Sequence, residues 1–151
     1  MIGFRVDSNE KIATGHFMRC KVIATELQSL GNSVLFICAD EIGYGLARHH
    51  GFSAIVLNSS WNDLDNEVEQ LIEIIRVYSI KKLVVDSYQV TYRYLATLNS
   101  EVPVIYMDDL NAFIYPVSVL VNYNMYAHDM PYIDLYRDTQ TTLLLGLDYL
   151  P

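Results

Sequence analysis

Short apolar runs of strand length alternate with longer amphipathic segments along this chain. Runs such as Leu83-Val84-Val85 are continuously apolar, which is typical of parallel strands that helices cover on both faces. The longer segments place their apolar residues at helical spacing. We predict strands over Ile2–Val6, Ser33–Ala39, Ser53–Leu57, Lys82–Val85, Val102–Met107 and Val117–Val121, a candidate seventh over Thr142–Leu145, and helices over Gly15–Leu30, Glu41–His50, Asp63–Ser79 and Thr91–Asn99.

This alternation predicts an α/β fold, a doubly wound, Rossmann-like domain built on a parallel sheet. Only about nine residues separate the fifth and sixth predicted strands, too few for an ordinary crossover helix. We expect a compact turn through Pro116 there. The tyrosine-rich stretch from Tyr123 to Tyr136 is predicted to be irregular, and its tyrosines either cover the end of the sheet or form an interface.

The composition excludes several classes of protein. A chain of 151 residues suits one domain, and 52% apolar with 19% charged residues excludes a disordered chain. The net charge of −8 opposes binding to nucleic acid. No apolar run is long enough to span a bilayer, no signal-peptide pattern precedes the first strand, and Cys20 and Cys38 form no C-x-x-C pair. We therefore expect a cytoplasmic protein with reduced thiols and with neither membrane nor nucleic-acid partners.

Polar residues follow the predicted strands, at the edge where open α/β sheets bind ligands. Asp and Asn form turns and cap helices, and we assign about half of these residues to helix capping alone, Asp40 and Asn58 first. The adjacent pair Asp108-Asp109 needs another explanation, since neighbouring carboxylates repel unless something neutralises them. The full set is Asp7, Asp40, Asn58, Asp86, Asp108, Asp109, Asn122 and Asn124.

The connection after the first strand carries the most chemistry. Gly15 leaves room for a ligand at the start of the first helix, and His16 lies in its first turn, where the helix dipole disfavours imidazolium. A neutral imidazole suits a general base, and Arg19 is placed to pair with Asp7 or a phosphate. The alternative is that Gly15 only allows close packing and His16 is solvated. No G-x-G-x-x-G or P-loop motif occurs.

These residues also carry a resemblance to a known family. Arg5-Val6-Asp7 followed by Ala13-Thr14-Gly15-His16-Phe17-Met18-Arg19-Cys20 resembles R-x-D-x(5)-G-x-G-H-x-x-R-C, the opening signature of the PseG/SpsG family. That family comprises nucleotide-sugar hydrolases of pseudaminic acid synthesis and related spore-coat polysaccharide proteins. Further matches follow in the family's order, at Val85-Asp86-Ser87-Tyr88, Asp108-Asp109-Leu110, Asn122-Tyr123-Asn124-Met125-Tyr126-Ala127 and Gly146-Leu147-Asp148-Tyr149.

The resemblance implies a two-domain GT-B fold and hydrolysis of UDP-2,4-diacetamido-2,4,6-trideoxy-β-L-altropyranose at its anomeric carbon. It implies His16 as the base that activates water and Tyr88 as a second catalytic residue, with no metal and no cofactor. Ala13 replaces the family's first loop glycine, and we expect the added methyl group either to narrow the loop or to alter the sugar accepted. The positions expected to bind the substrate are Asp7, Gly15, Arg19, Asp86, Asp108, Asp109, Asn122 and Asn124.

On the same resemblance, residues 1–151 correspond to the amino-terminal, base-bearing domain, and a carboxy-terminal domain outside this sequence supplies most nucleotide contacts. An inter-domain face left exposed would favour a homodimer of this domain. Two other functions stay open. One is a glycosyltransferase of the same fold, in which an acceptor hydroxyl replaces water, and the other is a non-catalytic binding or interaction domain.

The division of labour between two domains gives a first testable prediction. The 151-residue chain should bind UDP with a Kd of about 1 mM or weaker, about −4 kcal/mol, because its net charge of −8 opposes a diphosphate and one helix dipole offsets little of that. Titration calorimetry measures this affinity. Micromolar binding would place the nucleotide site on this domain and contradict the division.

Overall fold

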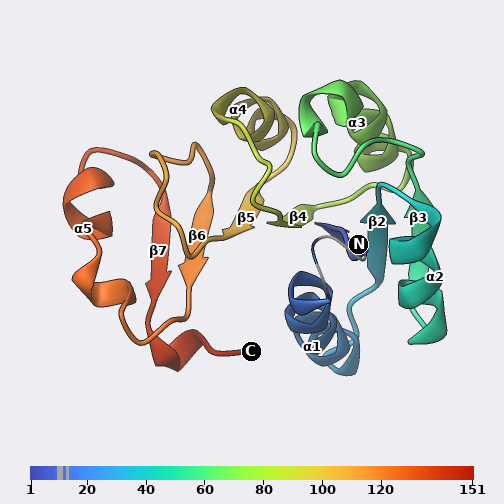
Figure 1. Ribbon diagram of the computed structural model, residues 1–151, viewed down its shortest axis with the longest axis horizontal. Helices are drawn as coiled ribbons and strands as arrows, with labels where there is room; N and C mark the ends of the chain where they lie inside the picture. The colour runs from blue at the N-terminus through green and yellow to red at the C-terminus, as the bar shows by residue number, and fades with distance from the viewer. Residues whose placement is uncertain (10–11, 13) are drawn as a thin grey trace.

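The computed structural model describes residues 1–9, 12 and 14–151. Within this part of the chain, seven parallel strands form one sheet in the order β3-β2-β1-β4-β5-β6-β7 (Figure 1). The predicted α/β fold with a Rossmann-like parallel sheet is confirmed, including the seventh strand. The strands are β1 (Ile2–Val6), β2 (Val34–Cys38), β3 (Ser53–Val56), β4 (Lys82–Asp86), β5 (Val104–Met107), β6 (Val119–Asn122) and β7 (Thr142–Leu145).

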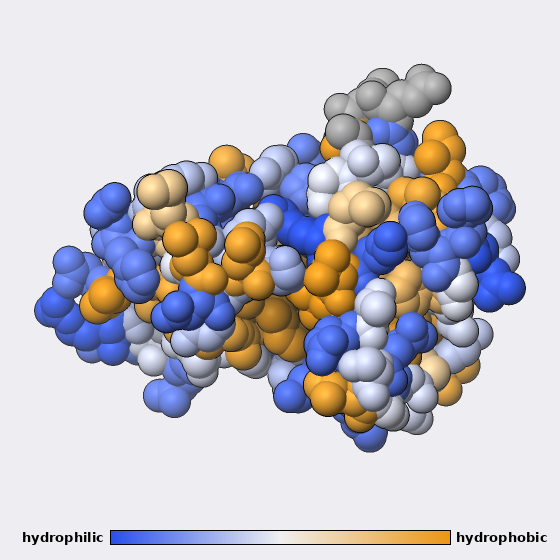
Figure 2. Space-filling model, turned by 90° about the horizontal axis from the view of Figure 1, so that it is seen from below, coloured by the Kyte–Doolittle hydropathy of each residue, from blue (hydrophilic) through white to orange (hydrophobic). Residues whose placement is uncertain are grey.

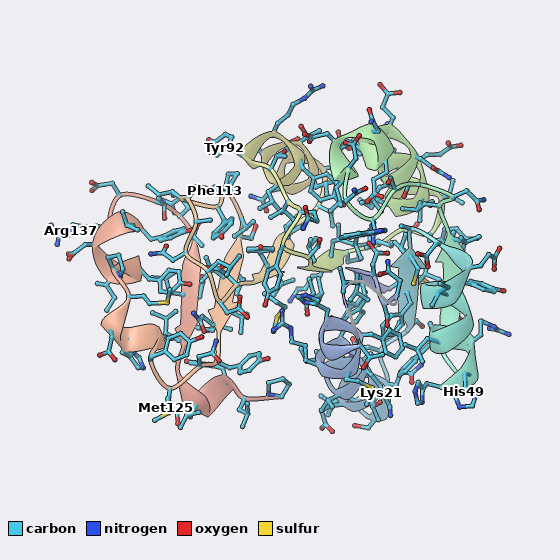
Figure 3. All side chains as sticks on the ribbon, viewed as in Figure 1. Lys21, His49, Tyr92, Phe113, Met125 and Arg137 are labelled. Carbon is cyan, nitrogen blue, oxygen red and sulfur yellow. The ribbon has the colours of Figure 1, made fainter. Side chains whose placement is uncertain are left out.

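Helices cover the sheet from both sides, as a doubly wound fold requires. Figure 1 shows α1 and α2 below the sheet and α3 and α4 above it. Lys21 and His49 accordingly lie below in Figure 3, and Tyr92 lies above. No helix of the described residues is long and apolar enough to cross a membrane. The helices are α1 (Gly15–Ser29), α2 (Glu41–His49), α3 (Val68–Val77), α4 (Tyr92–Glu101) and α5 (Tyr132–Leu135), with 3₁₀ segments η1 (Leu64–Glu67), η2 (Ala127–Asp129) and η3 (Leu147–Tyr149).

Side-chain alternation along the strands divides the core into two halves. On β5, for example, Val104 and Tyr106 face the half that contains α3, α4 and α5, whereas Ile105 and Met107 face the half that contains α1 and α2. The continuous apolar runs in the sequence therefore reflect strands with apolar packing on both faces.

One face of the sheet is incompletely covered over its last three strands, β5, β6 and β7. The segments that link β4, β5, β6 and β7 pack in the α3–α4 half of the core, so the opposite face of β5–β7 lacks a helix of its own among the described residues. Figure 2 shows apolar residues gathered in a hollow on this side. A groove of about 660 Å³ here is lined by Val22, Ile23 and Leu27 of α1 together with Leu150 and Pro151. The predicted homodimer stays a prediction.

Some local interpretations need correction. The helix predicted from Asp63 begins as the 3₁₀ segment η1, and the Tyr123–Tyr136 stretch contains η2 and α5. Asp40 caps α2 as expected, since its side chain accepts hydrogen bonds from two backbone N–H groups of the first turn. The capping role given to Asn58 is wrong. Asn58 adopts a left-handed conformation with φ of 55°, and η1 begins after Asp63.

A buried ion pair ties the end of β1 to the segment before α3. Arg5 is fully buried, and its guanidinium donates to both carboxylate oxygens of Glu67, at 2.5 Å and 2.9 Å. Its third nitrogen lies 2.7 Å from Asp7. Ser59 and Tyr94 also donate to Glu67, at 2.6 Å and 2.9 Å. Burial opposes the charge of Arg5, but the Asp7 and Glu67 carboxylates raise its pKa above the ordinary value.

Breaking this pair should destabilise the fold strongly. Glu67→Gln removes the charge that compensates a fully buried guanidinium, and we expect a loss of about 3 to 5 kcal/mol in the free energy of unfolding. The matched control is Glu101→Gln in the exposed pair Arg76–Glu101, with an expected loss below about 1 kcal/mol. Urea denaturation measures the free energy of unfolding of both variants. Equal losses in the two would show that the buried pair of Glu67 stabilises the fold no more than an exposed one does.

Candidate functional site

The candidate site lies where β1 and β4 are adjacent, at the carboxyl edge of the sheet. The strand order places β2 and β3 on one side of β1 and the later strands on the other, so this is the topological switch point at which such sheets bind ligands. His16 lies in the first turn of α1, which follows β1, Arg19 lies one turn further along, and Asp86 is the last residue of β4. The fold thus brings together three residues from two distant motifs.

Asp86 is the centre of this cluster. Its carboxylate is buried, and it accepts hydrogen bonds from Arg19 on both oxygens, from Nε and from Nη2, the latter at 2.5 Å. The Nδ1 atom of His16 lies 2.5 Å from Asp86 Oδ1. From this geometry, the Asp86 carboxylate neutralises Arg19 and orients the His16 ring.

The contacts of His16 decide its tautomer. An ionised carboxylate only accepts hydrogen bonds, so an unprotonated Nδ1 would set its lone pair against Asp86 Oδ1 at 2.5 Å. We therefore assign the proton to Nδ1, although Arg19 Nη2 also lies 2.9 Å from that atom. The Nε2 atom of neutral His16 then carries the free lone pair. This arrangement, a histidine oriented by a buried carboxylate, is the one that general bases use.

Tyr88 and Asp109 extend the site beyond His16. The rings of His16 and Tyr88 meet edge to face, with centroids 4.6 Å apart. The Tyr88 hydroxyl donates to Asp109 at 2.7 Å, and burial together with this hydrogen bond raises the pKa of Tyr88 to about 12. Asp109 Oδ1 is buried and accepts no hydrogen bond from the described residues, which leaves it available to a ligand's hydroxyl or amide group.

The sequence reasoning missed two aromatic residues here. Tyr123, between the matched residues Asn122 and Asn124, accepts a hydrogen bond from Arg19 at 3.1 Å. Trp61, in the loop after β3, lines a cavity of about 20 Å³ together with His16, Asp86 and Tyr88. That volume holds a single water molecule. The sequence does mark Trp61 as a candidate, because it is the chain's one tryptophan and follows the end of a predicted strand.

Asp7 and Gly15 also lie at this edge of the sheet, Asp7 in an ion pair with Arg5 and Gly15 exposed at the start of α1. The predicted pairing of Arg19 with Asp7 is wrong, because Arg19 binds Asp86 and Asp7 binds Arg5. Asp7 also accepts from the backbone N–H of Ala39 at 2.7 Å, yet it lines the same small cavity as His16. Gly15 is exposed, and a Cβ there would meet no atom within 4 Å, so close internal packing does not explain the glycine.

Three predicted substrate-binding residues form a neighbouring buried network. Asp108 accepts from the hydroxyls of Tyr115 at 3.0 Å and Tyr132 at 2.5 Å. Asn122 donates to Tyr132 at 3.0 Å and accepts from the side chain of Asn124 at 2.8 Å. The Asp108-Asp109 pair is thus accommodated because its two carboxylates have different partners. The contacts observed for Asp108 and Asn122 hold the tyrosine-rich segment against the sheet.

The remaining reactive groups are accounted for by burial. Cys20 and Cys38 are both free and buried. Burial and the neighbouring Asp86 carboxylate raise the pKa of the Cys20 thiol well above its ordinary value, which disfavours the thiolate that a nucleophile requires.

Among the described residues, no group of three or more histidine, cysteine and acidic side chains is placed to hold a metal ion. Ala13 lies outside the described residues.

Comparison with solved structures identifies a similar fold. The chain is similar to the crystal structure of a glycosyltransferase from Rickettsia africae ESF-5, with a TM-score of 0.66 and 13% sequence identity. The similarity covers 95% of this chain and 41% of that one. No family model matches the chain, and no curated protein matches it. The chain therefore has a glycosyltransferase-like fold and spans less than half of that solved protein.

The Asp86 cluster predicts a specific response of the histidine ring. Asp86→Asn removes the charge that binds Arg19 and fixes the proton on His16 Nδ1, so the neutral ring should become a mixture of tautomers. The ring nitrogen resonances of ¹⁵N-labelled histidine report this directly. His49, exposed on α2, is the internal control and should not change. A variant with an unchanged His16 tautomer would show that Asp86 does not set it.

Proposed function

We propose that this protein acts on a nucleotide-activated sugar, with His16 as the general base. In the proposed step, Nε2 of His16 takes the proton of a hydroxyl group as its oxygen attacks the anomeric carbon. The bond from that carbon to the phosphate oxygen breaks, and the nucleoside diphosphate leaves with the electron pair. The His16–Asp86 contact of 2.5 Å at the sheet's switch point is the observation that carries the proposal.

The start of α1 supports binding of a phosphate group near the base. Thr14 makes no side-chain hydrogen bond to the first turn of α1, so its side chain leaves that turn's N–H groups to an anion as far as the described residues go. Gly15 presents no side chain in their way. We propose that a second domain supplies most of the grip on the nucleotide, which accords with a fold that spans 41% of the solved glycosyltransferase.

The nucleophile is proposed to be an acceptor hydroxyl, because the similar solved structure is a glycosyltransferase. Hydrolysis is the second candidate, favoured by the ordered motifs of the PseG/SpsG family and by the water-sized cavity beside His16. Product analysis with the full-length protein and UDP-N-acetylglucosamine separates the two. UDP released in buffer alone indicates hydrolysis, whereas UDP released only with an added sugar acceptor indicates transfer. Release in neither case contradicts action on this class of sugar nucleotide.

Removal of the base tests the mechanism itself. His16→Asn should lower kcat of the full-length protein by about a hundredfold or more, the usual scale for losing a general base. His49→Asn is the matched control, since that histidine lies on α2 away from the Asp86 cluster, and its kcat should equal that of the unmodified protein. Near-normal turnover of the His16 variant would remove this residue from the mechanism.

A further inference from the structure

Trp61 is an aromatic side chain at the site that the protein's own contacts do not use. It is partly exposed and lines the small cavity beside His16 and Tyr88. Among the described residues, none accepts a hydrogen bond from its indole N–H and no ring stacks on it. A buried indole N–H usually finds a partner within the protein, whereas the partly exposed indole of Trp61 leaves its N–H and a ring face open to solvent or to a ligand. The indole N–H and a ring face of Trp61 are therefore available to a ligand next to the proposed general base, His16.

The loop that carries Trp61 is anchored on its amino-terminal side. The Ser59 N–H donates to the Ala39 carbonyl at 3.0 Å, and the Ser59 hydroxyl donates to Glu67 at 2.6 Å. Glu67 is in turn held by the fully buried Arg5. Asn58, just before this anchor, adopts the left-handed conformation that non-glycine residues rarely take. The loop is thus fixed at the sheet's carboxyl edge, and Trp61 is fixed close to the site.

We infer that Trp61 binds the sugar ring of the substrate, by packing an indole face against the C–H face of the sugar. The inference rests on the proposed function. His16 must lie next to the anomeric carbon in that function, and Trp61 shares a cavity with His16. The base of a sugar nucleotide is separated from the anomeric carbon by a diphosphate and a ribose. Trp61 is therefore placed to contact the sugar and not the nucleobase.

The indole N–H gives a direct test, because the chain contains one tryptophan and so one indole resonance. The 151-residue chain is titrated with UDP-N-acetylglucosamine, with UDP, and with free N-acetylglucosamine, while ¹H–¹⁵N spectra are recorded. We expect UDP-N-acetylglucosamine to shift the indole resonance and UDP to leave it nearly unchanged. Affinity is read from the backbone amide of Gly15 in every variant.

Variants then measure what the ring contributes. Trp61→Ala should weaken binding of UDP-N-acetylglucosamine by about three- to tenfold while leaving UDP binding unchanged. Trp61→Phe keeps an aromatic face and should restore affinity to within about twofold of the unmodified chain. Tyr92→Ala removes an exposed ring on α4 outside the site and is the control, with no expected change.

Other outcomes would overturn the inference, and they separate it from the proposed function. If UDP-N-acetylglucosamine shifts the Gly15 amide but neither moves the indole resonance nor binds Trp61→Ala more weakly, Trp61 does not contact the sugar and the proposed function stands. If UDP alone moves the indole resonance equally, Trp61 contacts the nucleotide instead. If no amide near His16 responds to UDP-N-acetylglucosamine and the full-length protein releases no UDP from it, the proposed function fails and the inference fails with it.

Discussion

The site depends on one interaction, the two-pronged hydrogen bonding of Arg19 to the buried carboxylate of Asp86. A buried carboxylate at the end of a central strand is costly unless a cation compensates it, and Arg19 on α1 supplies that cation. The same pair fixes the first turn of α1 against β4. His16 lies one turn before Arg19, so its ring can meet Asp86 only in this arrangement. The orientation of the proposed base follows from an ion pair that also stabilises the fold.

A second ion pair, Arg5–Glu67, supports the neighbouring part of the same edge. It joins β1 to the segment that carries Trp61, whereas Arg19–Asp86 joins α1 to β4. Both pairs lie at the carboxyl edge around β1 and β4, the point at which the order of strands reverses. The buried charges there anchor the loop after β3 and the start of α1 to the central strands. Rigid support of this kind is what a site needs if the reacting groups are to stay within hydrogen-bonding distance.

The fold was largely predictable because apolar periodicity reports directly on buried strands and helices. The seven strands were found, including Thr142–Leu145, and the errors fell on segment ends, on turn residues such as Asn58 and on the short helical segments η2 and α5. Side-chain partners were less predictable. The sequence placed Arg19 to pair with Asp7 or a phosphate, whereas in the structure Asp7 binds Arg5, and Arg19 binds Asp86 on the neighbouring strand β4. The place of Trp61 beside His16 could not be read from the sequence, because its loop is anchored through Ser59 to Glu67, which in turn is held by the distant Arg5.

The balance of charge at this edge bears on which end of the proposed sugar nucleotide would lie there. Asp86 and Asp109 contribute two carboxylates, and Arg19, at 3.8 Å from Asp109, is the cation between them. Arg5 is not available, since Asp7 and Glu67 already surround it. A diphosphate would therefore meet net negative charge except at the start of α1. Sugar hydroxyl and amide groups are donors that carboxylates accept well, and Asp109 Oδ1 has no partner among the described residues. We infer that this edge is suited to the sugar, and that the diphosphate extends away from the two carboxylates.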